Sequence, residues 1–293
     1  MNLPICDYED SQYQSQFWDQ GERVYEDQVE AIALQRLLPP RGDLLLELGA
    51  GAGRNTPRYQ NFKRIILVDY STSQLRQARV RLGDSDRYLY TAANIYHLPF
   101  VPGLFDTATM IRVLHHMADA PLALRGIRQV LKPGGVFILE FANKHNLKAI
   151  LRYFFHRQSW NPFSREPVEF ARLNFNFHPA AMGSWLQQSG FNIQRQLTVS
   201  HFRVDFLKRR LPLKLLVTLD SLAQWSGGIC QLSPSIFVRT QAAGDTPNAA
   251  AGQFFRCPVC GNSPLETSST SLDCSACGRQ WPIQDGIHDF RVS

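Results

Sequence analysis

The feature that most constrains the fold is the alternation of short apolar runs with helical patterns between residues 40 and 142. Apolar runs of strand length lie at 44–48, 65–69, 88–92, 107–111 and 136–141. Helix signals lie between them: Ser71 and Gln74 form a capping box, and Pro121 stands in the first turn of a later helix. Strands that alternate with helices pair in parallel, so the sequence predicts an α/β fold with a parallel sheet.

The rest of the chain divides at changes of composition. Beyond the fifth strand we expect a helix at 180–188, a strand at 191–199, a helix at 206–225 and a strand at 235–240. We predict an N-terminal helical segment at 1–40, an α/β body at 41–240, a linker at 241–253 and a small cysteine module at 254–293. The linker is expected because its residues include no large apolar side chain. Two helical insertions in the body, at about 143–178 and 203–233, are expected to cap the cleft.

Composition excludes several classes of protein. Apolar residues make up 44% of the chain, which is enough for a buried core and excludes wholesale disorder. No apolar run approaches the roughly 18 residues that a transmembrane helix needs. The N-terminus lacks the basic start and apolar core of a signal peptide, so we expect a cytoplasmic location.

The positive charge is concentrated in the middle of the chain. Residues 142–214 hold 12 Lys and Arg against 3 Asp and Glu, interleaved with aromatic residues. This combination suits a partner that carries phosphate groups, such as a nucleic acid. An ordinary solvated face with aromatics turned into the core remains an alternative. A third possibility is a membrane surface and a lipid-like substrate, because residues 206–219 are amphipathic and include Lys208, Arg209 and Arg210.

Four of the six cysteines form two C-x2-C pairs separated by 13 residues. They are Cys257, Cys260, Cys274 and Cys277. Two such pairs can complete a tetrahedral site of four sulfurs, which is the arrangement of structural Zn2+. A disulfide pair or a redox couple is the alternative. Four protein ligands leave no open coordination position, so we expect a structural ion rather than a catalytic one.

A glycine-rich loop with acidic residues on both sides follows the first strand. Gly49, Gly51 and Gly53 allow a tight turn that brings backbone against a ligand. A dinucleotide site prefers G-x-G-x-x-G, and here the third glycine comes one residue early. Asp69 ends the second strand, where a carboxylate can bind both ribose hydroxyls, and Glu47 could face a positive ligand group. A sulfonium-bearing amino acid nucleoside therefore fits better than NAD.

A set of motifs in this region resembles the class I S-adenosylmethionine-dependent methyltransferases. The motifs are the glycine loop, Asp69, Ala93-Asn94-Ile95, Leu98-Pro99-Phe100, Phe105-Asp106, Arg112-Val-Leu-His115-His116 and Leu131-Lys-Pro-Gly-Gly135. The resemblance implies a Rossmann-like, seven-stranded sheet whose last strand is antiparallel. It also implies S-adenosylmethionine as cofactor and S-adenosylhomocysteine as product.

The same resemblance assigns roles to individual residues. It implies that the loop lies under the methionine part, that Asp69 holds the ribose and that Tyr70 flanks the adenine. The full set of expected cofactor-binding residues is Glu47, Gly49, Ala50, Gly51, Gly53, Asp69, Tyr70, Asn94, Ile95 and Arg112. Asn94 and Ile95 are expected at the adenine edge. The family usually has Asp where this chain has Asn94, whose amide still offers an acceptor.

The cysteine module is similar to the small zinc-ribbon activator subunit of methyltransferases that act on tRNA, rRNA and release factors. The similarity covers the four cysteines, Gly261, Gly278 and the Trp281-Pro-Ile-x-Asp-Gly-Ile287 run. It implies an accessory module and favours RNA or a translation-related protein as the substrate, bound through a basic cap at 144–214. A small-metabolite or lipid-like acceptor, and a scaffold that binds cofactor without catalysis, remain the alternatives.

Methyl transfer is an in-line displacement and needs a general base only if the acceptor still carries a proton. The candidate bases are His115, His116, His145 and His178. For each of them a structural role is the alternative, because adjacent His115 and His116 cannot both point into the cleft from a regular strand.

Overall fold

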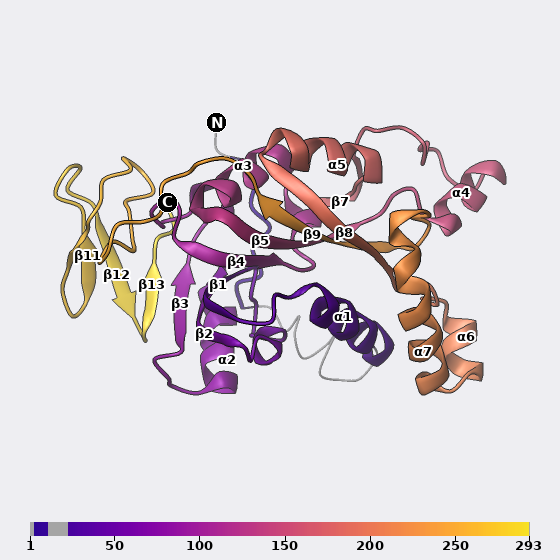
Figure 1. Cartoon of the computed structure of the whole chain (residues 1–293), viewed down its shortest axis with the longest axis horizontal. Helices are drawn as coiled ribbons and strands as arrows, with labels where there is room; N and C mark the ends of the chain where they lie inside the picture. The colour runs from indigo at the N-terminus through magenta and orange to yellow at the C-terminus, as the bar shows by residue number, and fades with distance from the viewer. Residues whose placement is uncertain (1–2, 11–22, 293) are drawn as a thin grey trace.

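One continuous sheet of eleven strands runs through the protein (Figure 1). The computed structural model describes residues 3–10 and 23–292. The strands of the body are β1 (Gly42–Leu48), β2 (Phe62–Asp69), β3 (Tyr88–Ala92), β4 (Phe105–Met110), β5 (Leu131–Ala142), β8 (Phe191–Val199) and β9 (Ser235–Ala242). The C-terminal module adds β10 (Glu266–Thr267), β11 (Ser271–Asp273), β12 (Gln280–Gln284) and β13 (Ile287–Asp289). A separate hairpin consists of β6 (Val168–Ala171) and β7 (Asn174–Asn176).

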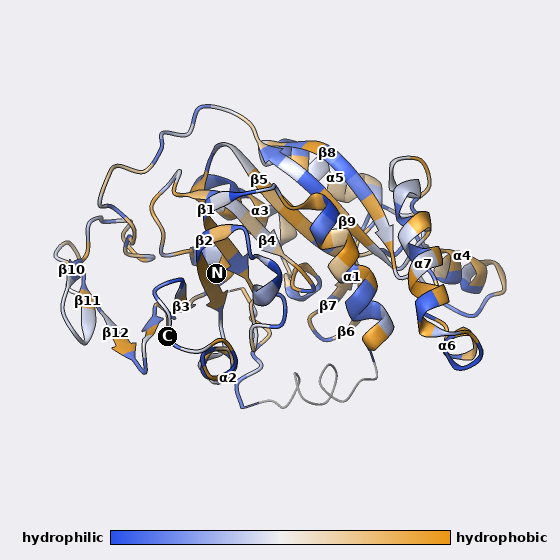
Figure 2. Cartoon of the chain, turned by 60° about the horizontal axis from the view of Figure 1, so that its bottom comes forward, coloured by the Kyte–Doolittle hydropathy of each residue, from blue (hydrophilic) through white to orange (hydrophobic). Residues whose placement is uncertain are grey.

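The seven body strands have the order β3-β2-β1-β4-β5-β9-β8. β1 pairs in parallel with β2 and with β4, whereas β9 is antiparallel to both of its neighbours. Figure 2 shows that the central strands are largely hydrophobic, which is typical of a sheet covered on both faces. The predicted α/β class, with seven body strands and an antiparallel β9, is therefore confirmed.

Helices cover both faces of this sheet. They are α1 (Val24–Leu37), α2 (Thr72–Leu82), α3 (Ala120–Val130), α4 (Leu147–Phe154), α5 (Pro179–Gln188), α6 (Asp205–Arg210) and α7 (Leu213–Ala223). α3 and α5 pack on one face, and α1, α2 and α7 on the other. The predicted capping box is present, because the Ser71 hydroxyl accepts the Gln74 N–H at 3.2 Å.

The two insertions differ in detail from the helices expected for them. The expected helix at 206–225 is divided into α6 and α7, because Leu211 is extended before Pro212. The insertion at 143–178 contains α4 but also the β6–β7 hairpin. Its helix ends at Phe154, and Pro162 and Pro167 then disfavour a further helix.

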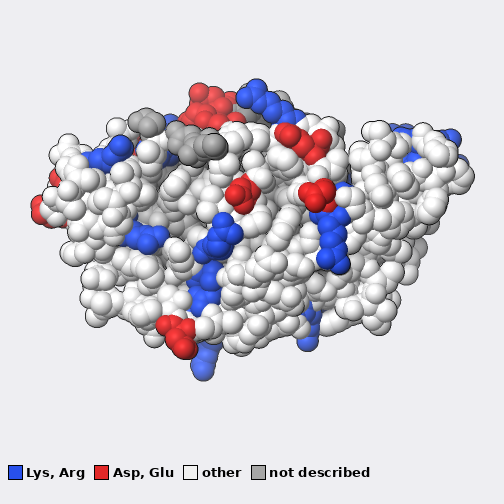
Figure 3. Space-filling view, turned by 90° about the horizontal axis from the view of Figure 1, so that it is seen from above, with Lys and Arg blue, Asp and Glu red and all other residues white. Residues whose placement is uncertain are grey.

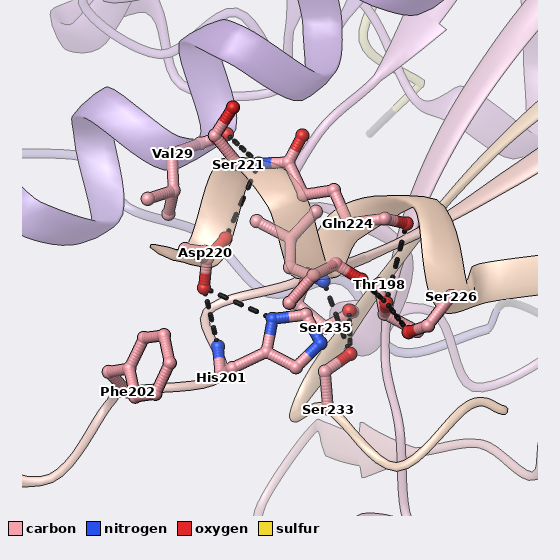
Figure 4. A network of polar contacts seen from close by, with 12 residues as sticks. Val29, Thr198, His201, Phe202, Asp220, Ser221, Gln224, Ser226, Ser233 and Ser235 are labelled. Atoms are coloured by element: carbon pink, nitrogen blue, oxygen red, sulfur yellow. Dashed lines mark hydrogen bonds and ion pairs between the residues drawn. The ribbon is translucent and has the colours of Figure 1, made fainter. Parts of the chain in front are cut away.

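A buried polar network fixes α7 to the body (Figure 4). The Asp220 carboxylate accepts hydrogen bonds from the Tyr25 hydroxyl at 2.6 Å and from the His201 N–H at 2.7 Å. Gln224 Nε2 donates to the Val29 carbonyl of α1 at 2.9 Å. Because a buried carboxylate is costly unless it is hydrogen-bonded, these contacts set the rotation of α7 about its own axis.

The C-terminal module extends the body sheet beyond β3. β13 pairs in parallel with β3, with Ile287 opposite Tyr90 and Asp289 opposite Ala92. The Phe290 N–H donates to the Ala92 carbonyl at 2.7 Å. The module therefore covers a strand edge that would otherwise expose unpaired backbone groups.

Aromatic side chains join the module to the body in one hydrophobic core. Phe255 stacks on Phe100 of the body with ring centroids 5.7 Å apart, and it lies 4.9 Å from Phe290. Trp281 packs against Phe290 at 5.5 Å. The core cluster that contains these rings also contains side chains of β4, β5 and α3.

The segment at 241–253 lies against the body. Arg128 of α3 donates to the Ala243 carbonyl at 2.9 Å and to the Thr246 hydroxyl at 3.0 Å. The Ala249 N–H donates to the Gly103 carbonyl at 3.0 Å. No helix among the described residues is both long and apolar enough to cross a membrane.

Phe290→Ala tests whether module and body unfold as one unit. The ring is 1% exposed, so its removal is expected to lower the free energy of unfolding by about 3–5 kcal/mol. Val259→Ala, at a 45% exposed position of the module, is the control and should change it by less than about 0.5 kcal/mol. Urea titration followed by circular dichroism measures both. A body transition that is unchanged in Phe290→Ala would contradict the shared core.

Candidate functional site

A cavity of about 130 Å3 lies at the carboxyl ends of the parallel strands. Its wall includes residues that directly follow four strands, namely Gly49 and Gly51 after β1, Tyr70 after β2, Asn94 and Ile95 after β3, and Arg112 after β4. Asp69, the last residue of β2, also lines it. This edge of an open α/β sheet, where the strand order reverses around β1, is where such folds bind ligands.

The glycine loop packs closely against its neighbours. Gly49 has a φ of 66°, and a Cβ there would lie 2.1 Å from Val113 Cγ2. Gly53 has a φ of 74°, and its Cβ would lie 3.1 Å from Leu82 Cδ1 of α2. Only glycine fits these two positions without strain. Gly53 therefore serves the packing of the loop on α2 and is not among the residues that line the cavity.

Asp69 holds the loop in place while it lines the cavity. One carboxylate oxygen accepts the Gly51 N–H at 2.8 Å, and the other accepts the Ser71 N–H at 3.0 Å. Burial raises the pKa of Asp69, although these backbone hydrogen bonds act in the opposite direction. Tyr70, the next residue, lies under the guanidinium of Arg291 from the C-terminal module, 5.8 Å from its ring centroid.

Asn94 begins a short 3-10 turn, Ile95–His97, at the cavity wall. Its side-chain oxygen accepts the Tyr96 N–H at 3.0 Å. Tyr96 also lines the cavity, and its hydroxyl accepts the Asp119 N–H. The contact of Asn94 and Ile95 with an adenine edge stays a prediction.

Glu47 and Ala50 are not among the residues that line the cavity. Glu47 is 4% exposed, and its carboxylate accepts the Thr56 hydroxyl at 2.6 Å. Burial raises the pKa of Glu47 to about 7. Ala50 is buried, and its N–H donates to the Val68 carbonyl at 3.0 Å. Glu47 therefore contacts Thr56 in this structure, and its contact with a ligand cation stays a prediction.

Arg112 joins the cavity wall to α1. It has a φ of 60°, and its N–H donates to the Glu140 carboxylate at 2.9 Å. Its side chain donates from Nε to Glu30 at 2.7 Å, and Arg54 of the glycine loop forms an ion pair with Glu30 at 3.0 Å. Burial raises the pKa of Glu30, but the two arginines outweigh it and hold this pKa below its usual range. The left-handed backbone of Arg112 is therefore held by two contacts, one between its N–H and Glu140 and one between its side chain and Glu30.

Of the four candidate bases, only His116 lines the cavity. Its Nδ1 lies 2.9 Å from the Leu173 carbonyl, which can only accept, so Nδ1 carries the proton. Its Nε2 lies 3.0 Å from the Tyr8 hydroxyl and, in this tautomer, accepts from it. Burial lowers the pKa of His116, which favours the neutral ring.

The other three histidines lie elsewhere. His115 packs beside His116 with ring centroids 3.9 Å apart but does not line the cavity. His145 and His178 lie together in the insertion, with ring centroids 5.1 Å apart. They do not line the cavity, so the structure brings one of the four candidates to it.

The sequence analysis missed the N-terminal segment at 3–10. Its Pro4, Ile5, Cys6 and Tyr8 line the cavity. The Glu9 carboxylate accepts the Thr72 and Ser73 N–H groups at 2.8 and 3.0 Å, at the N-terminus of α2. The segment has no apolar periodicity that could have predicted this position. Gln74, Val113 and Met117 also line the cavity and were not predicted.

The four cysteine sulfurs of the C-terminal module converge on one point. All lie within 4.8 Å of one another. Cys257 and Cys277 Sγ are 3.7 Å apart, and Cys260 and Cys274 Sγ are 3.4 Å apart. A Zn–S distance of about 2.3 Å implies sulfurs about 3.8 Å apart in a tetrahedron. The residues fit such a site, and none of the four forms a disulfide.

Comparison with protein families matches residues 46–139 to the family described as "Methyltransferase domain". Curated relatives include the ubiquinone/menaquinone biosynthesis C-methyltransferases UbiE of Vibrio cholerae and Cellvibrio japonicus. The first is 36% identical over 109 residues, which is 34% of this chain and 42% of the relative. The second is 33% identical over 113 residues, which is 36% of this chain and 45% of the relative. The chain thus spans less than half the length of these relatives.

Among solved structures, two neighbours share the fold. One is a chain of a complex between the Haloferax volcanii Trm112 methyltransferase activator and a candidate methyltransferase. The TM-score is 0.56 and the sequence identity is 16%. The alignment covers 79% of this chain and 96% of the neighbour's chain. The other is an S-adenosylmethionine-dependent methyltransferase from Mesorhizobium loti, with a TM-score of 0.51 and 18% identity, covering 73% of this chain and 97% of that chain. At these identities the similarity concerns the fold alone.

Glu47→Gln tests whether the raised pKa of the buried Glu47 carboxyl makes the stability of the protein depend on pH. With a pKa of about 7 in the folded state and an ordinary value of 4.5, the folded protein binds a proton that the unfolded chain has released. The contribution of Glu47 to the free energy of unfolding is therefore complete below pH 4.5. It is lost as the pH rises toward 7, by up to about 3 kcal/mol. Urea titrations across pH should show that loss in the wild type but not in Glu47→Gln. Glu266→Gln, at an exposed strand, is the control, and a Glu47→Gln slope equal to the wild type would refute the shift.

Proposed function

We propose, from the match of residues 46–139 to the family described as "Methyltransferase domain", that the chain uses S-adenosylmethionine to methylate a small acceptor in the cavity. The observation that carries the proposal is the convergence of the glycine loop, Asp69, Tyr70 and Asn94 on one cavity. The family resemblance expects each of these residues at the cofactor.

We propose that the cofactor binds along this wall. Gly49 and Gly51 lie beneath the methionine part, Asp69 accepts from the ribose hydroxyls, and Asn94 with Ile95 meets the adenine edge. Arg112 shapes the wall near the methionine part, with its charge balanced by Glu30. Glu47 contributes through Thr56 and the loop, because its carboxylate does not line the cavity.

S-adenosylmethionine, when bound, supplies a methyl group on a positively charged sulfur. The residues of the chain then position the acceptor in line with it and exclude water, which can be worth about 7–11 kcal/mol. The N-terminal segment covers the cavity with Pro4, Ile5 and Tyr8. We assign the role of base to His116, since its neutral Nε2 accepts a hydrogen bond from the Tyr8 hydroxyl and is able to take a proton from an acceptor hydroxyl in the cavity.

Two observations support a small acceptor with apolar parts. Apolar side chains, including Ile5, Val113 and Met117, share the cavity wall with the polar ones. The curated relatives are named as C-methyltransferases of ubiquinone and menaquinone biosynthesis. RNA or a translation-related substrate is the second candidate, supported by the basic excess at 142–214.

We further propose that the four cysteines bind a structural Zn2+ and that the module supports the cofactor site. Arg291 of this module lies over the Tyr70 ring and 3.9 Å from the Glu9 carboxylate. It is held by a two-pronged ion pair with Asp289, the last residue of β13. A module that loses its metal is expected to release this contact.

The test of methyl transfer uses S-adenosylmethionine with a labelled methyl group and cell extract separated into RNA, protein and organic-soluble fractions. We expect label in the organic-soluble or small-molecule fraction. Asp69→Ala should weaken S-adenosylhomocysteine binding, measured by calorimetry, by about tenfold or more, since a hydrogen-bonded charge is lost. Asp84→Ala, an exposed carboxylate near the other end of α2, is the control.

Two results of this test would count against the proposal. Label found only in RNA would establish the second candidate. Binding of S-adenosylhomocysteine without transfer to any fraction would favour a non-catalytic scaffold.

Metal analysis tests the cysteine site. We expect about one zinc per chain in the purified protein and none in Cys257→Ser/Cys274→Ser. Because that variant should also release Arg291, its affinity for S-adenosylhomocysteine is expected to fall severalfold. Cys230→Ser, at an exposed isolated cysteine, should retain the metal. Metal that survives in the double variant would exclude this ligand set.

A further inference from the structure

Two helices at one end of the molecule expose apolar faces. α4 presents Leu147, Leu151 and Phe154, and α7 presents Leu215, Leu219 and Leu222. In each helix these residues follow the spacing i, i+4, i+7, which forms one stripe along the surface. Their exposed fractions lie between 40% and 67%. We call these six side chains together the α4–α7 surface.

The exposure of large apolar side chains is concentrated at this end. Seventeen such side chains are exposed among the described residues, six of them at 147–170 and eight at 204–229. Both insertions lie at the end of the molecule opposite the C-terminal module, as Figures 1 and 2 show from two directions. Scattered exposed leucines need no explanation, but a concentration of this kind marks an interaction site.

The stripes are fixed in their outward orientation. The inner side of α7 carries Leu216 and Asp220, which are buried. Asp220 is held by His201, as Figure 4 shows, and also by Tyr25. α4 begins at Asn146, whose side chain accepts the Ala149 N–H at 3.0 Å, and Ala149 is its buried residue. Neither helix can turn its leucines inward without breaking these contacts.

Basic side chains border the α4–α7 surface. No Asp or Glu occurs at 145–165 or at 206–219, whereas Lys148, Arg152, Arg209, Arg210 and Lys214 do. Lys and Arg, and no acidic side chain, are visible at the α4 end in the view of Figure 3. In an anionic membrane, the apolar stripes would contact the acyl chains and the basic residues would contact the negatively charged headgroups.

We propose that the α4–α7 surface docks the protein onto an anionic lipid bilayer. Leucine stripes offer little to RNA, which would use the basic residues and stacked aromatics. The same insertion contacts the cavity wall from outside, since the Leu173 carbonyl of the β6–β7 turn accepts from His116, which lines the cavity. Docking would bring a lipid-like acceptor to this side of the cavity, and that part of the inference rests on the proposed function.

Vesicle flotation tests the proposal. The probes are vesicles of phosphatidylcholine alone and of phosphatidylcholine with phosphatidylglycerol at about three to one. We expect the wild type to float with the anionic vesicles only, and less at high salt. Leu151→Glu and Leu219→Glu should each reduce the bound fraction by about tenfold. Val80→Glu, at an 86% exposed position of α2, is the matched control and should float as the wild type does.

Four outcomes would overturn the proposal. The wild type could fail to float with anionic vesicles, or Leu151→Glu and Leu219→Glu could float as well as Val80→Glu. Sedimentation could instead show that these variants convert a dimer into a monomer, which would assign the surface to a second copy of the chain. The proteins could also fail to bind vesicles while all variants bind a single-stranded RNA of about 20 nucleotides equally well. That result would assign the basic residues to RNA.

Calorimetry with S-adenosylhomocysteine on the same proteins separates this test from that of the proposed function. All four proteins should bind it equally, because the substituted residues do not line the cavity. A protein that binds vesicles but not S-adenosylhomocysteine would refute the function and leave the surface intact.

Discussion

The parallel pairing of β1 between β2 and β4 is the constraint on which the rest of the structure depends. It brings the ends of three strands to one edge, so that Gly49, Asp69 and Arg112, far apart in sequence, line one cavity. These strands are buried on both faces, and a shift of one residue would turn every side chain to the opposite face. The register that maintains the hydrophobic core therefore also fixes the functional residues.

Buried charge gives this edge a second constraint. Glu30 is 1% exposed and is tolerated there because Arg54 of the glycine loop and Arg112 after β4 both pair with it. One carboxylate of α1 thus holds the loop and the end of β4 together. α1 therefore belongs to the site although it does not line the cavity.

The sequence predicted those features that depend on local pattern. The ends of β2 and β3, the capping box at Ser71 and the antiparallel β9 follow from periodicity, capping chemistry and a family resemblance. Features that depend on distant contacts had no such signal. The pairing of β13 with β3 and the position of Tyr8 over the cavity involve residues far apart in sequence. The hydrogen bond between Glu47 and Thr56 had no such signal either, because the path of the loop and not the spacing brings these two residues together.

The N-terminal segment links the two ends of the molecule. Tyr8 contacts His116, which in turn contacts Leu173 of the insertion that carries α4. The adjacent Glu9 caps α2 and lies beside Arg291 of the cysteine module. Two neighbouring residues of this segment therefore contact elements that are far apart along the chain. The position of Tyr8 in the cavity wall is thus supported by its own contact with His116 and by the contacts of Glu9 with α2 and Arg291.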